Sequence, residues 1–116
     1  MLPHLPKMVR AYLSGTTLTL QGHAGRAPRG QDLVCAAVSM LAYALAQRLT
    51  ELESEGALVQ PPQIRLASGD AQISAVAKEN YAAQVQEAFD LIRSGLTLLQ
   101  HHYPQQVELR TERKKL

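Results

Sequence analysis

The alternation of apolar and polar residues near the start of the chain predicts a β-hairpin. Between residues 8 and 13 apolar side chains fall at every second position, the period of a strand with one buried face. Ser14-Gly15 supplies a turn, and "TTLTLQ" (residues 16–21) resumes the alternation. We therefore expect two paired strands that end at Gly22-His23.

Two longer segments have the period of an amphipathic helix. After Gly30 one apolar stripe continues to Leu52, and Asp32 is suited to cap this helix or to lie in its first turn. Gly56 is well placed to end it. The second stripe runs from Val85 to Leu99, with Asn80 as its candidate N-cap and Tyr103-Pro104 as its stop. Four stripe residues are assigned to the core: Leu45, Leu49, Ile92 and Leu96.

The remaining segments predict three more strands. "QIRLA" (63–67) and "AQISAVA" (71–77) flank a turn at "SGD", and "QVELR" (106–110) alternates once more. The order is ββαββαβ, an α+β fold (an α/β sandwich) with a mainly antiparallel sheet and two helices on its buried face. We expect a single domain over residues 1–116, with a short basic C-terminal tail from about residue 111.

Composition narrows the class of protein. The 116 residues are 46% hydrophobic, as in a globular chain, and the single cysteine cannot form an internal disulfide, which suits a reducing compartment. No leader peptide and no uninterrupted apolar run of membrane-spanning length is visible. The net charge of +2 and 4% aromatic residues argue against nucleic-acid binding. We expect a cytoplasmic protein that contacts neither membrane nor nucleic acid.

The candidate chemistry lies where the first hairpin meets the first helix. His23 ends a strand that we expect to be central, and Cys35 falls in the first turn of the expected helix. Unpaired N–H groups at a helix start favour the thiolate and can stabilise an oxyanion. An imidazole nearby can take the thiol proton and later protonate a leaving amine. The two residues therefore suit a nucleophile and its general base.

Three further features support that interpretation. Asp32, Cys35 and Ser39 are spaced 3 and 4, so they share one helix flank at the border of the core. Asp32 can orient His23, and Ser39 can donate a hydrogen bond. Glycines at 22, 25 and 30 would let the intervening loop move and let a peptide backbone approach closely.

Other interpretations compete with this one. A lone cysteine on an Ala-rich helix is usually buried and inert. A binding module would keep the apolar stripes and tolerate Cys35→Ser, and a redox sensor would lose its thiol reversibly under mild peroxide. His23 and Cys35 supply only two ligands where zinc needs at least three, so we expect no metal and no cofactor.

The block "GHAG", a short loop and "GQDLVCAAVSML" resembles the signature of the bacterial ribosomal-processing cysteine proteases, the Prp family. Downstream, "LIRSGLTLLQHHYPQQVELR" is similar to that family's second helix and final strand. The resemblance implies a homodimeric α/β sandwich and an endopeptidase. It would remove the N-terminal extension of a large-subunit ribosomal protein, number twenty-seven of the L series, during ribosome assembly.

By motif position, the resemblance implies that Cys35 is the nucleophile and His23 the general base, with Asp32 and Ser39 in supporting roles. A substrate loop would then contain Gly22, Ala24, Gly25, Arg26, Arg29 and Gly30. Family members commonly carry aromatic and acidic residues in this loop, where the present chain has "RAPR". Its two arginines can hold a thiolate or bind an acidic group of the substrate, so substrate preference is expected to differ.

Overall fold

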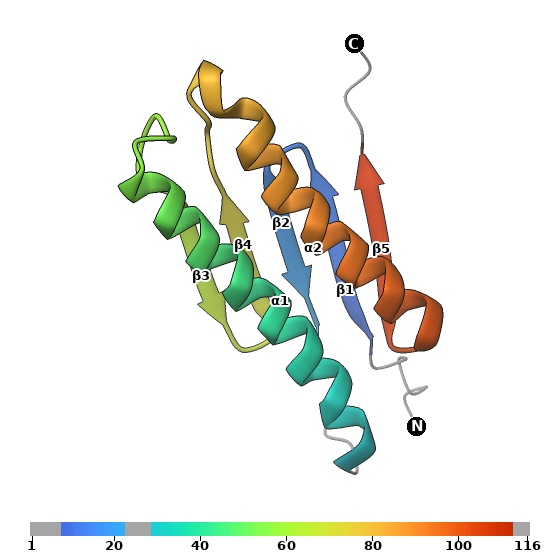
Figure 1. Ribbon diagram of the computed structural model, residues 1–116. Helices are drawn as coiled ribbons and strands as arrows, with labels where there is room; N and C mark the ends of the chain where they lie inside the picture. The colour runs from blue at the N-terminus through green and yellow to red at the C-terminus, as the bar shows by residue number, and fades with distance from the viewer. Residues whose placement is uncertain (1–7, 23–28, 113–116) are drawn as a thin grey trace.

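The computed structural model describes residues 8–22 and 29–112, with side chains from residue 33 onward in the second range. Within these ranges the chain forms five strands and two long helices (Figure 1). In chain order they are β1 (Val9–Ser14), β2 (Thr17–Gln21), α1 (Arg29–Ser54), β3 (Gln63–Ala67), β4 (Asp70–Ser74), α2 (Ala82–His102) and β5 (Val107–Glu112). The predicted ββαββαβ order and α+β fold class are confirmed.

The five strands form one sheet in the order β3-β4-β2-β1-β5, so β2 is central, as predicted for the strand that leads to His23. The pairs β1–β2, β2–β4 and β3–β4 are antiparallel; short turns join β1 to β2 and β3 to β4, whereas α1 and β3 lie between β2 and β4 in the chain. The pair β1–β5 is parallel, with Val9 opposite Val107. The sheet therefore has two edges, β3 and β5.

Both helices cover the same face of the sheet (Figure 1) and run antiparallel to each other. Their apolar stripes form the core with the inward residues of the strands, and the four predicted core residues are all buried. Leu41 is half-buried and lies against α2, where a Cβ added at Gly95 would lie 2.8 Å from its Cδ2. Gly95 therefore sets how closely the helices approach.

Several element boundaries differ from the sequence expectation. Asn80 is not an N-cap: it lies inside a 3₁₀ turn (Glu79–Tyr81), and α2 starts after it with Tyr81 at the capping position. β4 ends at Ser74 because the chain then turns away, and Ala77 forms a single bridge with Leu58 instead. β5 continues to Glu112, into the segment expected to be a tail. Gly56 follows α1 with φ +80, and Tyr103 caps α2, both as predicted.

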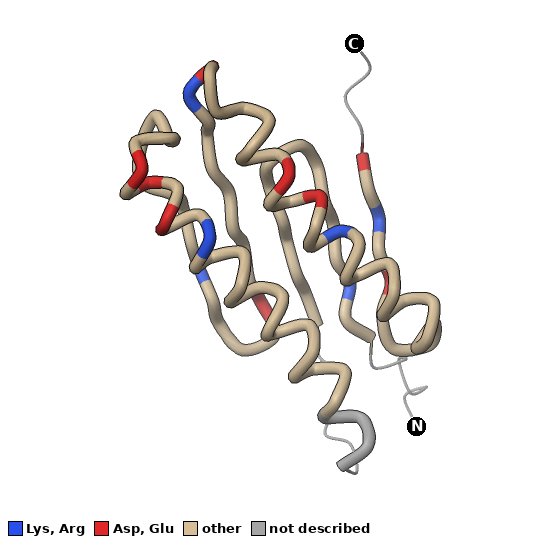
Figure 2. The backbone as a smooth tube through the Cα atoms, in the orientation of Figure 1, with Lys and Arg blue, Asp and Glu red and all other residues tan. Residues whose placement is uncertain are grey.

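The first helix is unusually apolar for a helix on a sheet. No Asp, Glu, Lys or Arg occurs between Leu33 and Gln47, and the first charged residue after them is Arg48 (Figure 2). By length and composition alone Leu33–Ser54 could cross a membrane, with a mean hydropathy of 1.5. Its Val34, Leu45, Leu49 and Leu52 are buried against the sheet, and 33% of the apolar segment is buried in all.

Candidate active site

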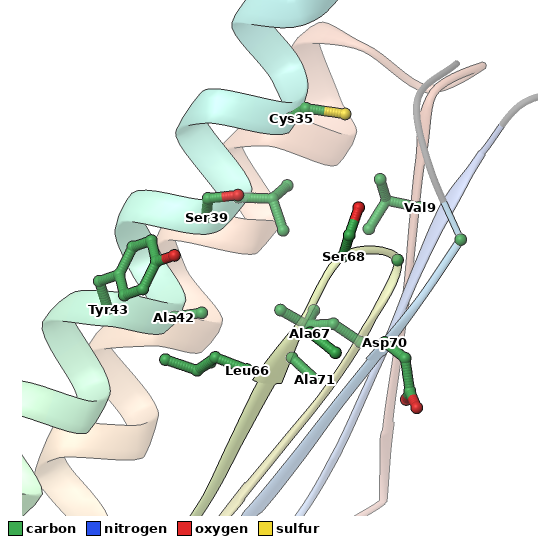
Figure 3. Close-up of a pocket in the computed structure, with 14 residues that line it drawn as sticks. Val9, Cys35, Ser39, Ala42, Tyr43, Leu66, Ala67, Ser68, Asp70 and Ala71 are labelled. Atoms are coloured by element: carbon green, nitrogen blue, oxygen red, sulfur yellow. The ribbon is translucent and has the colours of Figure 1, made fainter. Parts of the chain in front are cut away.

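A cavity of about 370 Å³ lies between one flank of α1 and the turn that joins β3 to β4. Its size is within the range of ligand-binding sites in proteins. Cys35 and Ser39 line it from the helix, Ser68 and Gly69 line it from the turn, and Gly22 lines it from the end of β2 (Figure 3). Residues far apart in the sequence thus meet at the carboxyl end of β2 and β3.

Cys35 is half-buried and packs against the border of the core, as its offset from the apolar stripe predicts. Its sulfur points into the space between α1 and the β3–β4 turn (Figure 3). The expectation that Cys35 lies in the first turn is wrong: α1 begins at Arg29, which makes Cys35 its seventh residue, in the second turn. Because the field of a helix terminus falls off within one turn, it acts less on this thiol than the sequence suggested.

Ser39 lies one turn further along α1, and its hydroxyl points into the same space (Figure 3). Tyr43 follows after another turn and also lines the cavity, a residue that the sequence analysis did not single out. The spacing of 4 and 4 from Cys35 through Ser39 to Tyr43 was a readable signal, because residues four apart share a helix flank. These three side chains form the helical wall of the cavity.

The opposite wall comes from the β3–β4 hairpin, which the sequence predicts, but its place beside β2 depends on the long-range pairing of β4 with β2. Ser68 directs its hydroxyl toward the cavity and gives a second neutral hydrogen-bond donor across from Ser39 (Figure 3). Asp70 is the only charged residue among the described lining residues. Its carboxylate is bound by the Arg65 guanidinium, with Nη1 3.0 Å from Oδ2. The interior therefore presents thiol, hydroxyl and apolar groups to a ligand.

Gly22, predicted to belong to the substrate loop, is hydrogen-bonded directly after the end of β2. Its N–H donates to the Gly69 carbonyl oxygen at 2.9 Å, which ties the end of β2 to the β3–β4 turn. Its φ of +94 belongs to the left-handed region, and a Cβ added there would overlap the Met8 carbonyl oxygen. Only glycine fits both conditions. The chain that continues to His23 therefore leaves the sheet from a defined point on the cavity floor.

The other predicted site residues divide into two groups. His23, Ala24, Gly25 and Arg26 lie outside the described residues. Arg29 and Gly30, expected in the loop, belong to the first turn of α1, where unbonded N–H groups make glycine tolerable. Asp32 lies in that same first turn, one of its two predicted placements.

Metal chemistry finds no support in the part of the chain that the structure describes. No group of three His, Cys, Asp or Glu residues within residues 8–22 and 29–112 is placed to hold a metal ion. Among the described residues, the cavity places a thiol beside hydroxyl donors, and its one charged residue, Asp70, is paired with Arg65. Such an arrangement can bind an extended neutral chain and offer its sulfur to a carbonyl carbon.

Three solved structures share this architecture. The Streptococcus mutans protein SMU.848 is 25% identical, with a TM-score of 0.72 over 93% of this chain and 97% of its own. Two structures of the ribosomal processing protease Prp from Staphylococcus aureus match with TM-scores of 0.70 and 0.71 at 18% and 17% identity. Each covers 90% of this chain and 100% of its own; one holds a covalently linked product peptide and the other a substrate peptide.

Sequence comparison places the chain more specifically than fold similarity does. No curated protein matches it significantly in sequence. The model of the family described as cysteine protease Prp matches residues 8–108, which include both hairpins, both helices and the start of β5. The chain therefore belongs to the cysteine protease Prp family.

Proposed function

We propose that this protein is a cysteine endopeptidase in which Cys35 is the nucleophile and His23 the general base. The observation that carries the proposal is that Gly22 and Cys35 line one cavity. Gly22 is the residue directly before His23, so the chain enters the histidine from the floor of the cavity that the thiol faces. Family membership supplies the type of chemistry, and the cavity supplies the place for it.

The proposed reaction has two steps. The Cys35 thiolate attacks the scissile carbonyl carbon, the C–N bond breaks, and His23 transfers the former thiol proton to the leaving amine. Water, deprotonated by His23, then hydrolyses the thioester and restores the thiol. Ser39 and Ser68 are placed to donate hydrogen bonds to the substrate, and Asp32 is proposed to orient His23.

The proposed substrate is the N-terminal extension of the large-subunit ribosomal protein numbered twenty-seven in the L series. Support comes from the motif shared with the family and from the peptide-bound Prp structures of the same fold. Ribosome assembly takes place in the cytoplasm, so the enzyme is proposed to act there. Among the described lining residues the one charged side chain, Asp70, is already paired with Arg65, which is compatible with a neutral segment at the cut, whereas a strongly charged one would be desolvated without a partner.

The enzyme is also proposed to work as a homodimer. Four large apolar side chains on the outer side of the helix layer support this, because each is more than 60% exposed: Leu33, Met40, Leu91 and Leu98. Exposed apolar side chains of this size are often covered by another protein surface. Light scattering coupled to size exclusion should give twice the 12.7 kDa chain mass, and Met40→Glu with Leu98→Glu should give the monomer.

The test of the activity is cleavage of the ribosomal precursor. Purified protein is incubated with the N-terminally extended ribosomal protein from the same organism, and the products are identified by mass spectrometry. We expect one cut, abolished in both Cys35→Ala and His23→Ala, while Thr97→Ala on the far side of α2 cleaves normally. No cut by the folded, reduced wild type would reject the proposal, and full activity of Cys35→Ser would favour a binding module.

A further inference from the structure

We propose that the substrate peptide docks as an additional strand on the free edge of β3 and reaches Cys35 along it. The inference rests on the proposed protease function and names how the same site holds its substrate. Its occupant is one extended peptide segment, paired through backbone hydrogen bonds and recognised by side chains at alternate positions.

The first support is that β3 is an open edge. It lies at one end of the sheet, and all five of its residues are exposed. Ile64 and Leu66 face the helix side, opposite the buried Ile73 and Ala71 of β4, yet each remains 38% exposed. α1 contacts β4 more than it contacts β3, and these two apolar side chains are only partly covered. The edge therefore presents a partly exposed apolar strip that consists of Ile64 and Leu66.

The second support is the direction in which the backbone groups of β3 point. Ser68-Gly69 forms a two-residue turn, so Ala67 and Asp70 close the hairpin as a hydrogen-bonded pair. Hydrogen-bonded and non-hydrogen-bonded pairs alternate along an antiparallel ladder. The N–H and C=O groups of Ile64 and Leu66 consequently point away from β4, toward the unpaired side. An incoming strand would find four backbone groups on these two residues.

The third support is continuity between the edge and the cavity. The end of β3 and its turn, Leu66 to Ser68, line the same cavity as Cys35. Tyr43 stands across from Leu66 on the helical wall, and its side chain is 57% exposed (Figure 3). A peptide paired with β3 would place alternate side chains between Tyr43 and the Ile64–Leu66 strip. Further along, it would meet the thiol.

Charge favours a peptide of neutral sequence at this edge. Arg65 is the only charged residue on β3, and it lies on the outer face in a salt bridge with Asp70. The facing flank of α1 carries no charge from Leu33 to Gln47. Backbone pairing together with apolar side chains therefore accounts for recognition, with no ion pair required.

The experiment uses a peptide that spans the N-terminal extension and the cut, with single N-methyl groups placed at successive backbone amides. N-methylation removes one hydrogen-bond donor and leaves the side chain unchanged. We expect kcat/KM to fall about tenfold at every second amide on one side of the cut and to change little between them. Equal sensitivity at all amides, or none, overturns the docking mode.

A protein variant tests the same contact from the other side. Ile64→Pro removes an outward N–H that no β4 bond uses, and Ile64→Ala removes the same side chain but keeps the N–H. We expect the proline variant to raise KM about tenfold over the alanine variant at similar kcat, with unchanged circular dichroism. If Ile64→Pro alters the oligomeric state and not KM, the edge pairs with a second copy and the inference is wrong.

Binding to Cys35→Ala separates this inference from the proposed activity. The probe is the fluorescein-labelled extension peptide, and anisotropy reports its affinity without any cleavage. If N-methylation weakens binding at every second backbone amide along the peptide, strand pairing is supported even if the wild type cuts nothing. Cleavage by the wild type without that alternation keeps the protease and rejects the pairing.

Discussion

The two edges of the sheet are built in opposite ways. β5 pairs with β1 along its whole length and lies under α2; its Val107 is buried, and Gln100 of α2 accepts a hydrogen bond from the Leu109 N–H at 2.6 Å. Within the described part of the chain β3 has no such cover, and all its residues are exposed. An uncovered edge invites pairing with other chains, so natural proteins usually protect it. Here the unprotected edge is the one beside the candidate nucleophile.

The two edges of the sheet also differ in charge. β5 carries Glu108, Arg110 and Glu112 on its outer side, with the Arg110 Nε 2.9 Å from the Glu108 Oε1. The Tyr12 hydroxyl donates a hydrogen bond to the Glu112 carboxylate, and this bond raises the pKa of Tyr12 above its ordinary value. Charged side chains of this kind discourage edge-to-edge association. β5 is thus an edge protected by α2 and by charged side chains, whereas the edge of β3 stays accessible to another chain.

The largest expected effect comes from truncating a large apolar side chain to alanine, once on α2 and once on β3. Phe89→Ala on α2 removes a buried ring and should lower the free energy of unfolding by about 3–5 kcal/mol. Leu66→Ala on β3 should lower it by less than about 1.5 kcal/mol, because that side chain is already partly exposed. Urea denaturation measures both values.

The same two variants should rank in the opposite order in the cleavage assay. Leu66→Ala removes part of the cavity wall and should reduce kcat/KM severalfold, whereas Phe89→Ala should cleave at its normal rate wherever it remains folded. Equal losses of stability in the two variants would show that β3 is as much a part of the core as α2 is.

A smaller effect separates the two glycines at opposite ends of the first hairpin. Gly22→Ala should cost about 3 kcal/mol, because φ is positive and the Met8 carbonyl oxygen occupies the space for a Cβ. Gly15→Ala also has a positive φ but nothing within 4 Å, so about 1 kcal/mol is expected.

Measuring kcat as well as stability separates the roles of the two glycines further. Gly22→Ala should lower kcat more than its stability loss explains at a temperature where it is folded, since it shifts the point from which the chain leaves for His23. Gly15→Ala should leave kcat unchanged. A normal kcat for Gly22→Ala would mean that its anchoring serves the fold alone.

The smallest effect tests the protection of the β5 edge. Gln100→Ala leaves the Leu109 N–H without its side-chain acceptor and should cost about 1 kcal/mol. Amide exchange of Leu109 should speed up accordingly, and Gln100→Glu, which keeps an acceptor oxygen, should restore most of the protection. Unchanged exchange in Gln100→Ala would indicate that β1 alone protects this strand.

Local patterns were sufficient to predict most of the elements. The stripe residues Leu45, Leu49, Ile92 and Leu96 are buried as expected, since a period of 3.6 must face a core in a helix of this length. Asn80 shows the limit of such reasoning. Its side chain is a good cap in isolation, but the preceding chain enters through a 3₁₀ turn and the helix begins later.

The candidate site was only partly accessible from sequence, for a physical reason. Cys35 and Ser39 share a flank through local spacing, and the structure places both on the cavity. Ser68 and Leu66 join them because β4, the second strand of their hairpin, pairs with β2, a long-range pairing that no local pattern encodes. The parallel match of β1 with β5 was hidden for the same reason.

That parallel match has a consequence for synthesis of the protein. β1, which borders the candidate site through Val9, is translated before the other strands, yet its outer neighbour β5 is translated after all of them. A nascent chain therefore emerges with one side of β1 unpaired until residues 107–112 have left the ribosomal tunnel. The mature sheet, and with it the complete base of the cavity, can form only after β5 has been released. Translation itself would then delay the appearance of proteolytic activity.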